Sequence, residues 1–134
     1  LNYYRIIKPY LINLKKNKKL KIIKSDHNNI NKFMKQTDLA IVPSEWNEQY
    51  GRVIQESAAC GSIVIGSRVG AIPEILISED FIFEQGNIVS LKNKIEDVFV
   101  NYNDLRIKFN EIEKIINLTR SIDAQAKKIT EIFN

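Results

Sequence analysis

The chain has few of the residues that build disulfides, metal centres and irregular linkers. Its 134 residues include one cysteine, one histidine, three prolines and five glycines. Cys60 alone cannot form an internal disulfide, and its place among small residues at a helix end favours an inert, packed thiol. His27 has no cysteine partners at zinc spacing, so we expect a polar loop residue and no metal site.

Long apolar runs are also missing. No run approaches the length of a membrane span, and no signal-peptide pattern is present. Neither an internal repeat nor a glycine- or proline-rich linker divides the chain. With 44% hydrophobic and 27% charged residues, the composition is that of an ordinary globular domain. We therefore expect one domain, in a cytoplasmic protein.

The net charge of +4 comes partly from one cluster of lysines. These are Lys15, Lys16, Lys18, Lys19, Lys21 and Lys24. A cluster of this kind is typical of a solvated helix end, or of weak peripheral contact with the anionic inner face of a membrane. Because no aromatic residues interleave with the lysines, we expect no nucleic-acid binding.

The most informative stretch reads as strand, loop, helix and strand. The apolar run Leu39–Val42 ends at Pro43, which disfavours further sheet pairing. Between Val53 and Ala58 buried-type residues recur at helical spacing, Gly61 follows as a helix stop, and Ser62–Ile65 is a second apolar run. Two continuous apolar strands joined by a helix predict an α/β, Rossmann-like parallel sheet with helices on both faces.

Ligands of such sheets bind beyond the carboxyl ends of the strands. The loop Pro43–Tyr50 leaves one such end, and the segment Ser67–Ile72 leaves the next. Gly51 would open the helix, and the free amides of Gly51, Arg52 and Val53 would offer donors and a positive dipole end. The arrangement favours an anionic ligand such as a phosphate.

Two carboxylates flank this helix start. Glu56 lies about one and a half turns into the helix, where a carboxylate can accept from both hydroxyls of a ribose. Glu48 lies in the loop, nearer any group attached beyond the phosphate. Each acid has a plainer interpretation. Glu56 is placed to form a surface ion pair with Arg52, and Glu48 to complement the helix dipole.

The string E-Q-Y-G-R-V-I-Q-E, from Glu48 to Glu56, resembles the E-x7-E motif of retaining GT-B glycosyltransferases, particularly glycosyltransferase family 4. The flanking PS, SAACGS and VGAIPE also match, so the resemblance is strong from Asp38 to Leu76 and holds only in outline elsewhere. It implies the half of the enzyme that holds a nucleotide-sugar donor.

The resemblance also implies roles for individual residues. Glu48 would be catalytic, contacting the donor sugar, and Glu56 would hold the ribose hydroxyls. The amides from Tyr50 to Val53 would lie near the phosphate and the sugar. Gly70 would allow close approach of the backbone to the donor, and Ser44 would donate to the ligand or shape the turn after Pro43.

By the same resemblance, residues 1–134 would be a partial C-terminal, donor-binding domain. Nothing before Leu20 resembles the first strand and basic phosphate loop of that family, so we expect an incomplete site without transfer on its own. A missing N-terminal domain would supply the acceptor pocket for a glycan or lipid-linked hydroxyl, in a pathway of glycan biosynthesis. The donor is a substrate, and no cofactor or metal is expected.

The remaining elements fit an α/β domain but carry no recognisable chemistry. We expect a helix from Tyr3 to Leu14, a strand at Leu20–Ile23, a helix at Asn29–Gln36, a short helix starting near Pro73, an edge strand at Phe81–Phe83, helices from Ile88 onward, and a last helix with Ile122, Ala126, Ile129 and Ile132 that closes the domain. Trp46 would either stack on a sugar or base, or pack within its loop.

Two other classes of function share this architecture. A dinucleotide-dependent oxidoreductase requires a G-x-G-x-x-G turn after a strand, and neither candidate loop contains one. A non-catalytic nucleotide-binding or interaction domain would retain the two acids for structure alone. It remains the alternative to the glycosyltransferase.

Overall fold

The computed structural model describes residues 27–133. The chain divides into two compact units, residues 1–30 and 31–134, and only the last four residues of the first are described. The helix expected at Tyr3–Leu14, the strand expected at Leu20–Ile23 and the lysine cluster lie outside the described residues.

The first described element is helix α2 (His27–Met34). It coincides with the helix expected at Asn29–Gln36 but begins and ends two residues earlier. His27 is thus the first residue of a helix, and its expected place in a loop is wrong.

Three parallel strands form the sheet, in the order β1 (Leu39–Val42), β2 (Ile63–Ser67) and β3 (Ile82–Phe83). Leu39 pairs with Ile63, and every residue of the central strand β2 is buried. The parallel sheet predicted from the two apolar runs is therefore confirmed, and β2 continues two residues beyond the predicted Ile65.

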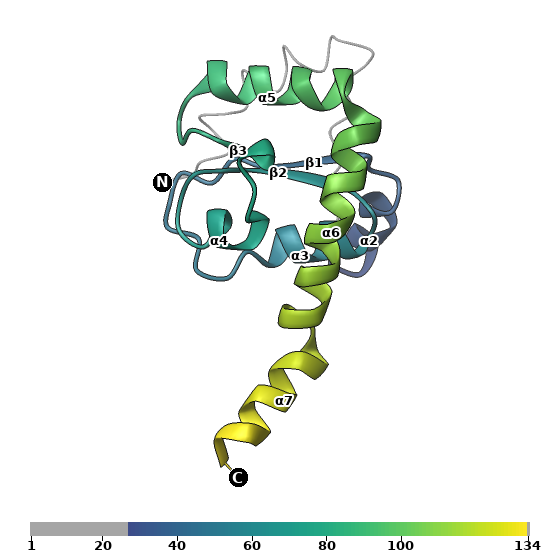
Figure 1. Ribbon diagram of the computed structural model, residues 1–134, viewed down its shortest axis with the longest axis vertical. Helices are drawn as coiled ribbons and strands as arrows, with labels where there is room; N and C mark the ends of the chain where they lie inside the picture. The colour runs from purple at the N-terminus through teal and green to yellow at the C-terminus, as the bar shows by residue number, and fades with distance from the viewer. Residues whose placement is uncertain (1–26, 134) are drawn as a thin grey trace. The chain divides into compact units, whose positions relative to one another are not determined.

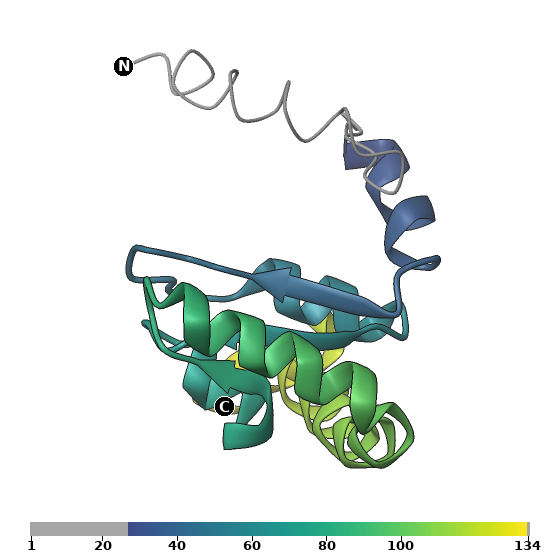
Figure 2. The ribbon, with the colours of Figure 1, turned by 90° about the horizontal axis from the view of Figure 1, so that it is seen from above.

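Helices cover both faces of this sheet (Figures 1 and 2), as predicted. Helix α3 (Arg52–Ala59) and the short α4 (Ile72–Leu76) lie on one face, and α5 (Ile88–Val100) lies on the other. The remaining elements are a 3-10 turn η1 (Glu79–Phe81), the long α6 (Tyr102–Arg120), which contacts both α3 and α5, and α7 (Ile122–Phe133).

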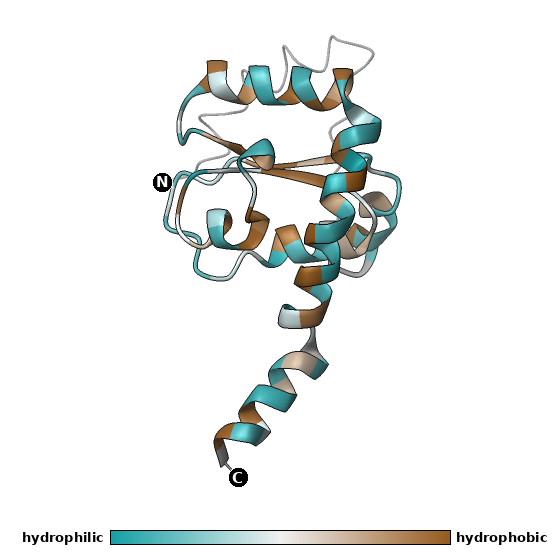
Figure 3. Cartoon of the chain, viewed as in Figure 1, coloured by the Kyte–Doolittle hydropathy of each residue, from teal (hydrophilic) through white to brown (hydrophobic). Residues whose placement is uncertain are grey.

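One apolar stripe packs the long helix α6 into the core, beside α3, α5 and η1. Leu105, Phe109, Ile112 and Ile116, spaced by three and four residues, are its buried side chains. Phe109 meets Phe81 edge to face, with ring centroids 5.0 Å apart and an interplanar angle of 76°. Figure 3 shows the strands as an apolar layer, whereas apolar and polar residues alternate along the helices.

Helix α7 differs from the expectation that it closes the domain. Its Ile129 and Ile132 are 57% and 77% exposed, and no α7 residue belongs to the buried core of the described chain. Within the described residues α7 contacts the end of α6 and, through Gln125, Tyr50, but its isoleucines stay outside the core.

The two loops at the carboxyl ends of β1 and β2 are joined by backbone contacts. The Ser67 hydroxyl donates to the Ser44 carbonyl at 2.8 Å, and the Ala71 amide donates to the Glu48 carbonyl at 2.7 Å. Gly70, with φ 54°, lies so close that an added Cβ would be 2.3 Å from the Glu48 carbonyl oxygen. The neighbour that requires a glycine here is therefore the first loop itself.

We expect Phe109→Ala to destabilise the fold by about 3–5 kcal/mol, because it leaves a cavity beneath α6 and removes the contact with Phe81. Denaturant unfolding followed by circular dichroism measures this loss. Phe99→Ala is the matched control, since Phe99 is 73% exposed and its truncation should change stability by less than about 0.5 kcal/mol. Equal effects of the two substitutions would contradict this packing.

We expect Gly70→Ala to cost more stability than Gly86→Ala. Both glycines have positive φ, so each alanine is strained by about 1 kcal/mol, but only at position 70 does the new Cβ meet backbone atoms. That overlap should add roughly 1–3 kcal/mol. Thermal unfolding of the two variants gives the difference, and equal losses would show that the two loops are not in contact.

Candidate functional site

Helix α3 starts at the carboxyl edge of the sheet, directly after the first loop. Gly51 precedes it with φ 65° and ψ 40°, and its carbonyl accepts from the amides of Ile54 and Gln55. The amide of Gly51 donates to Glu48 Oε1 at 3.1 Å. The prediction that Gly51 opens the helix is thus confirmed. Its amide, expected to be free, is occupied by the Glu48 carboxylate.

The next two amides, of Arg52 and Val53, have no acceptor within the described part of the chain. The first amides of a helix have no partner inside the helix, and they carry the positive end of its dipole. Gly51 is buried, and a Cβ there would lie 2.4 Å from Ile75 Cδ1, so core packing fixes the position of these amides. The site therefore offers two oriented donors at the surface.

Glu56 and Arg52 form the ion pair that the plainer interpretation predicts. Arg52 Nη2 lies 3.2 Å from Glu56 Oε1, four residues along the helix, and the two side chains are 77% and 40% exposed. An exposed pair of this kind stabilises little. Exchange of either partner for a ligand group therefore costs little, and the pair leaves the predicted ribose contact of Glu56 untested.

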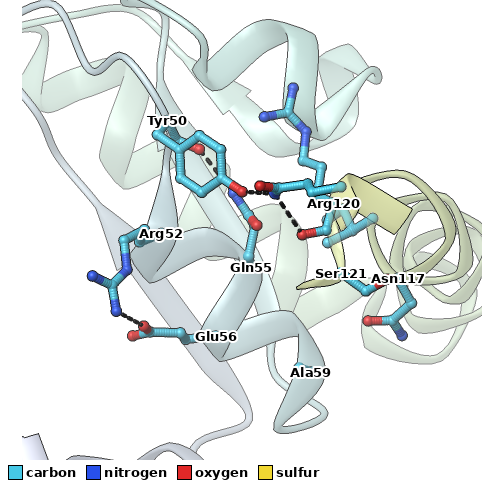
Figure 4. Close-up of a pocket in the computed structure, with 10 residues that line it drawn as sticks. Tyr50, Arg52, Gln55, Glu56, Ala59, Asn117, Arg120 and Ser121 are labelled. Atoms are coloured by element: carbon cyan, nitrogen blue, oxygen red, sulfur yellow. Dashed lines mark hydrogen bonds and ion pairs between the residues drawn. The ribbon is translucent and has the colours of Figure 1, made fainter. Parts of the chain in front are cut away.

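A pocket of about 530 Å³ lies beside this pair, between α3, the end of α6 and the start of α7 (Figure 4). Gln125 donates to the Tyr50 hydroxyl and, at 3.1 Å, to the Arg120 carbonyl. Gln55 donates to the Tyr50 carbonyl at 2.8 Å. The ring of Tyr50 is therefore directed toward α7. The donor contact predicted for Tyr50 concerns its backbone amide and is separate from this. No sequence pattern marks Gln125, which lies 75 residues from its partner.

The first loop exposes Trp46 at the same edge. Its side chain is 77% exposed, so the alternative that it packs within the loop is wrong. The loop itself is held in place, because Gln85 Nε2 donates to the Glu45 carbonyl at 2.6 Å and Ser67 holds the Ser44 carbonyl. Sequence reasoning missed Gln85 and Ser67, since both act on backbone atoms far along the chain.

Arg68, directly after β2, is turned toward acids. Its Nε lies 2.8 Å from Glu84 Oε1 and its Nη1 lies 3.0 Å from Glu79 Oε1. These hydrogen bonds lower the pKa of Glu79 and raise that of Arg68. A hydrogen bond from Lys108 at 2.8 Å likewise lowers the pKa of Asp80. Arg68 therefore links η1 to the exit of β3 and is not a free anion-binding group.

Two further observations concern metal sites and membrane-spanning helices. Among residues 27–133, no three His, Cys, Asp or Glu side chains gather where they could hold a metal ion. No helix in this part of the chain is both long and apolar enough to cross a membrane. The absence of a metal and of a cofactor stays a prediction.

Comparison with solved structures places the fold among GT-B glycosyltransferases. A glycosyltransferase from Rickettsia africae ESF-5 matches 98% of this chain and 36% of that chain, with a TM-score of 0.83 and 28% identity. Anabaena HepE, solved in complex with UDP, matches 99% of this chain and 38% of that chain, with a TM-score of 0.86. At 19% identity, the second likeness shows the fold alone.

A curated relative is the gpi3 subunit of phosphatidylinositol N-acetylglucosaminyltransferase from Schizosaccharomyces pombe. It is 32% identical over 108 residues, which are 81% of this chain and 24% of that protein. The chain thus spans only about a quarter of this relative and somewhat over a third of the two solved structures.

The family model described as "Glycosyl transferases group 1" matches residues 7–115, which include both loops and helix α3. The resemblance seen in the string from Glu48 to Glu56 is confirmed at the level of this family. The chain belongs to the group 1 glycosyl transferases.

Proposed function

We propose that this chain is the donor-binding, C-terminal part of a larger family 4 glycosyltransferase. The intact enzyme transfers a hexose-type sugar from a nucleotide diphosphate to a hydroxyl acceptor, with retention. The family match and the UDP bound to Anabaena HepE support a nucleotide-sugar donor. The greater length of the relatives supports a second domain outside this chain.

The observation that carries the proposal is the start of helix α3. Two amides without partners in the described chain, those of Arg52 and Val53, face the carboxyl edge where ligands of such sheets bind. Glu48 precedes them and Glu56 follows them on the same helix. We assign the donor diphosphate to these amides, because a phosphate accepts hydrogen bonds and carries the complementary charge.

In this arrangement the two acids contact different parts of the donor. Glu56, exposed and held only by Arg52, accepts from the two ribose hydroxyls. Arg52 is freed by this exchange and neutralises part of the diphosphate charge. Glu48 holds the Gly51 amide with one oxygen and turns its charge toward the sugar, where positive charge develops as the bond to phosphate breaks. The transfer then needs no cofactor.

The acceptor is a hydroxyl of a glycan or of a lipid-linked carrier. The relative from Schizosaccharomyces pombe, named for a phosphatidylinositol acceptor, supports a lipid-linked hydroxyl. We place the acceptor pocket in the domain outside this chain. On its own, the chain therefore binds the donor without transferring its sugar.

We expect Glu56→Ala to weaken binding of the nucleotide sugar roughly tenfold or more, because it removes two charge-assisted hydrogen bonds to the ribose. Calorimetric titration with uridine, guanosine and adenosine diphosphate sugars measures this and identifies the base. Glu96→Ala is the matched control, since Glu96 forms the same kind of exposed pair, with Lys92, on α5. Equal binding by both variants would remove Glu56 from the site.

We expect Glu48→Gln to lower turnover of the intact enzyme by about 10²–10³ with little change in stability. The amide oxygen of glutamine still accepts from Gly51, so the loop keeps its hydrogen bond while the charge is lost. Glu48→Ala loses both and should also unfold at a lower temperature. Steady-state kinetics and thermal unfolding separate the two effects. Normal turnover of Glu48→Gln would limit Glu48 to holding the helix start.

A further inference from the structure

Trp46 is the only tryptophan of the chain, and it is exposed to solvent. Its side chain is 77% exposed, although tryptophan is among the most buried residues on average. No ring or cation within residues 27–133 is paired with it. Exposure alone does not set Trp46 apart, because other large apolar residues such as Phe99, at 73%, are as exposed. What distinguishes Trp46 is its place in the loop that leaves β1, two residues before Glu48.

The backbone on both sides of Trp46 is fixed. Three hydrogen bonds hold this loop: the carbonyls of Ser44, Glu45 and Glu48 accept from Ser67, Gln85 and Ala71, at 2.8, 2.6 and 2.7 Å. The exposure of the indole is thus not the result of a loose loop. Because the backbone is already fixed, a ligand that covers the indole has to order only the side-chain torsions of Trp46.

The anchors also place Trp46 relative to the acids. Gln85 follows β3, so Glu45 lies over the exit of that strand, whereas Glu48 contacts the start of α3. Trp46 directly follows Glu45, so its backbone lies on the β3 side of the loop, whereas Glu56, to which we assign the ribose, lies on α3. With the ribose assigned to Glu56, we place the sugar end of the donor, or the group that receives it, on this side of the loop.

We propose that Trp46 is a stacking surface for a pyranose ring. The ring belongs to the transferred sugar of the donor or to the acceptor, and both present the same chemistry. The C–H face of a pyranose packs on the apolar indole face, and the indole N–H donates to a sugar hydroxyl. This assignment rests on the proposed function and adds the residue that distinguishes a nucleotide sugar from a bare nucleotide.

The fluorescence of the 134-residue chain reports on Trp46 alone, because no other tryptophan is present. A nucleoside diphosphate should leave the emission unchanged, whereas the matching nucleotide sugar should shift it to shorter wavelength and protect it from acrylamide. Such a response assigns the ring to the donor. A response to methyl pyranosides, without nucleotide sugar, assigns it to the acceptor.

Substitutions then separate stacking from a structural role. Trp46→Ala should weaken the binding that responds, nucleotide sugar or pyranoside, about fivefold to tenfold, and Trp46→Phe should retain most of it. Neither substitution should change the affinity for the nucleoside diphosphate. If Trp46 had a structural role instead, its loss would also alter that affinity. The control is Phe99→Ala, an exposed aromatic near the far end of α5, about 15 Å along the helix from the β3 exit.

The inference is overturned if neither nucleotide sugars nor concentrated pyranosides alter the emission. It is also overturned if acrylamide cannot reach Trp46 in the ligand-free chain, because another segment then covers the indole. Failure of the proposed function is recognised separately, as the absence of calorimetric binding by any nucleotide or nucleotide sugar. The pyranoside titration still tests Trp46 in that case.

Discussion

The site depends on the contact between the loops that leave β1 and β2. The Ala71 amide holds the Glu48 carbonyl, and the lack of a side chain at Gly70 lets the two backbones come within contact distance. This contact sets the position of Glu48, whose carboxylate holds the Gly51 amide and so the start of α3. A change at Gly70 therefore acts on the helix start through the backbone, without touching a ligand.

Core packing and surface chemistry meet within one helix. Ile54, Ser57 and Ala58 are buried against the sheet, while Arg52 and Val53 are exposed on the first turn. The amides of that turn are thus oriented by the core and still open to a ligand. Preorganised donors of this kind need no rearrangement as charge develops, which is the condition for electrostatic stabilisation of a leaving diphosphate. The exposed Arg52 and Glu56 add charge that is easily redirected.

Local patterns predicted most of the sheet and of helix α3. The runs Leu39–Val42 and Ser62–Ile65 indicated two strands, and Gly51 and Gly61 marked the ends of the helix between them. Burial was predicted correctly for β2 alone, because Val42 is the only buried residue of β1 and Ile41 is 40% exposed. The parallel pairing followed from chain connectivity, because a strand–helix–strand unit has one common hand. The Arg52–Glu56 pair followed from helical spacing alone.

Contacts between distant residues could not be predicted in this way. Gln85 and Gln125 each donate to a loop residue 40 or 75 positions away, and neither lies in a pattern that names its partner. The spacing of apolar residues likewise predicted an apolar face for α7 but did not show what packs against it. In the structure Ile132, on that face, is 77% exposed. A repeat of apolar residues defines the face of a helix, but three-dimensional packing decides whether the core has room for it.

The assignment of a diphosphate to the start of α3 is tested most directly by the amide NMR spectrum of the chain during titration with uridine, guanosine and adenosine diphosphates. We expect one of them to bind saturably and to cause the largest shifts at the amides of Arg52 and Val53, with smaller shifts in the loop Pro43–Tyr50. Saturable binding with its largest shifts elsewhere, for example at the pocket-lining Asn117 and Ser121, would contradict the assignment of the diphosphate to the start of α3.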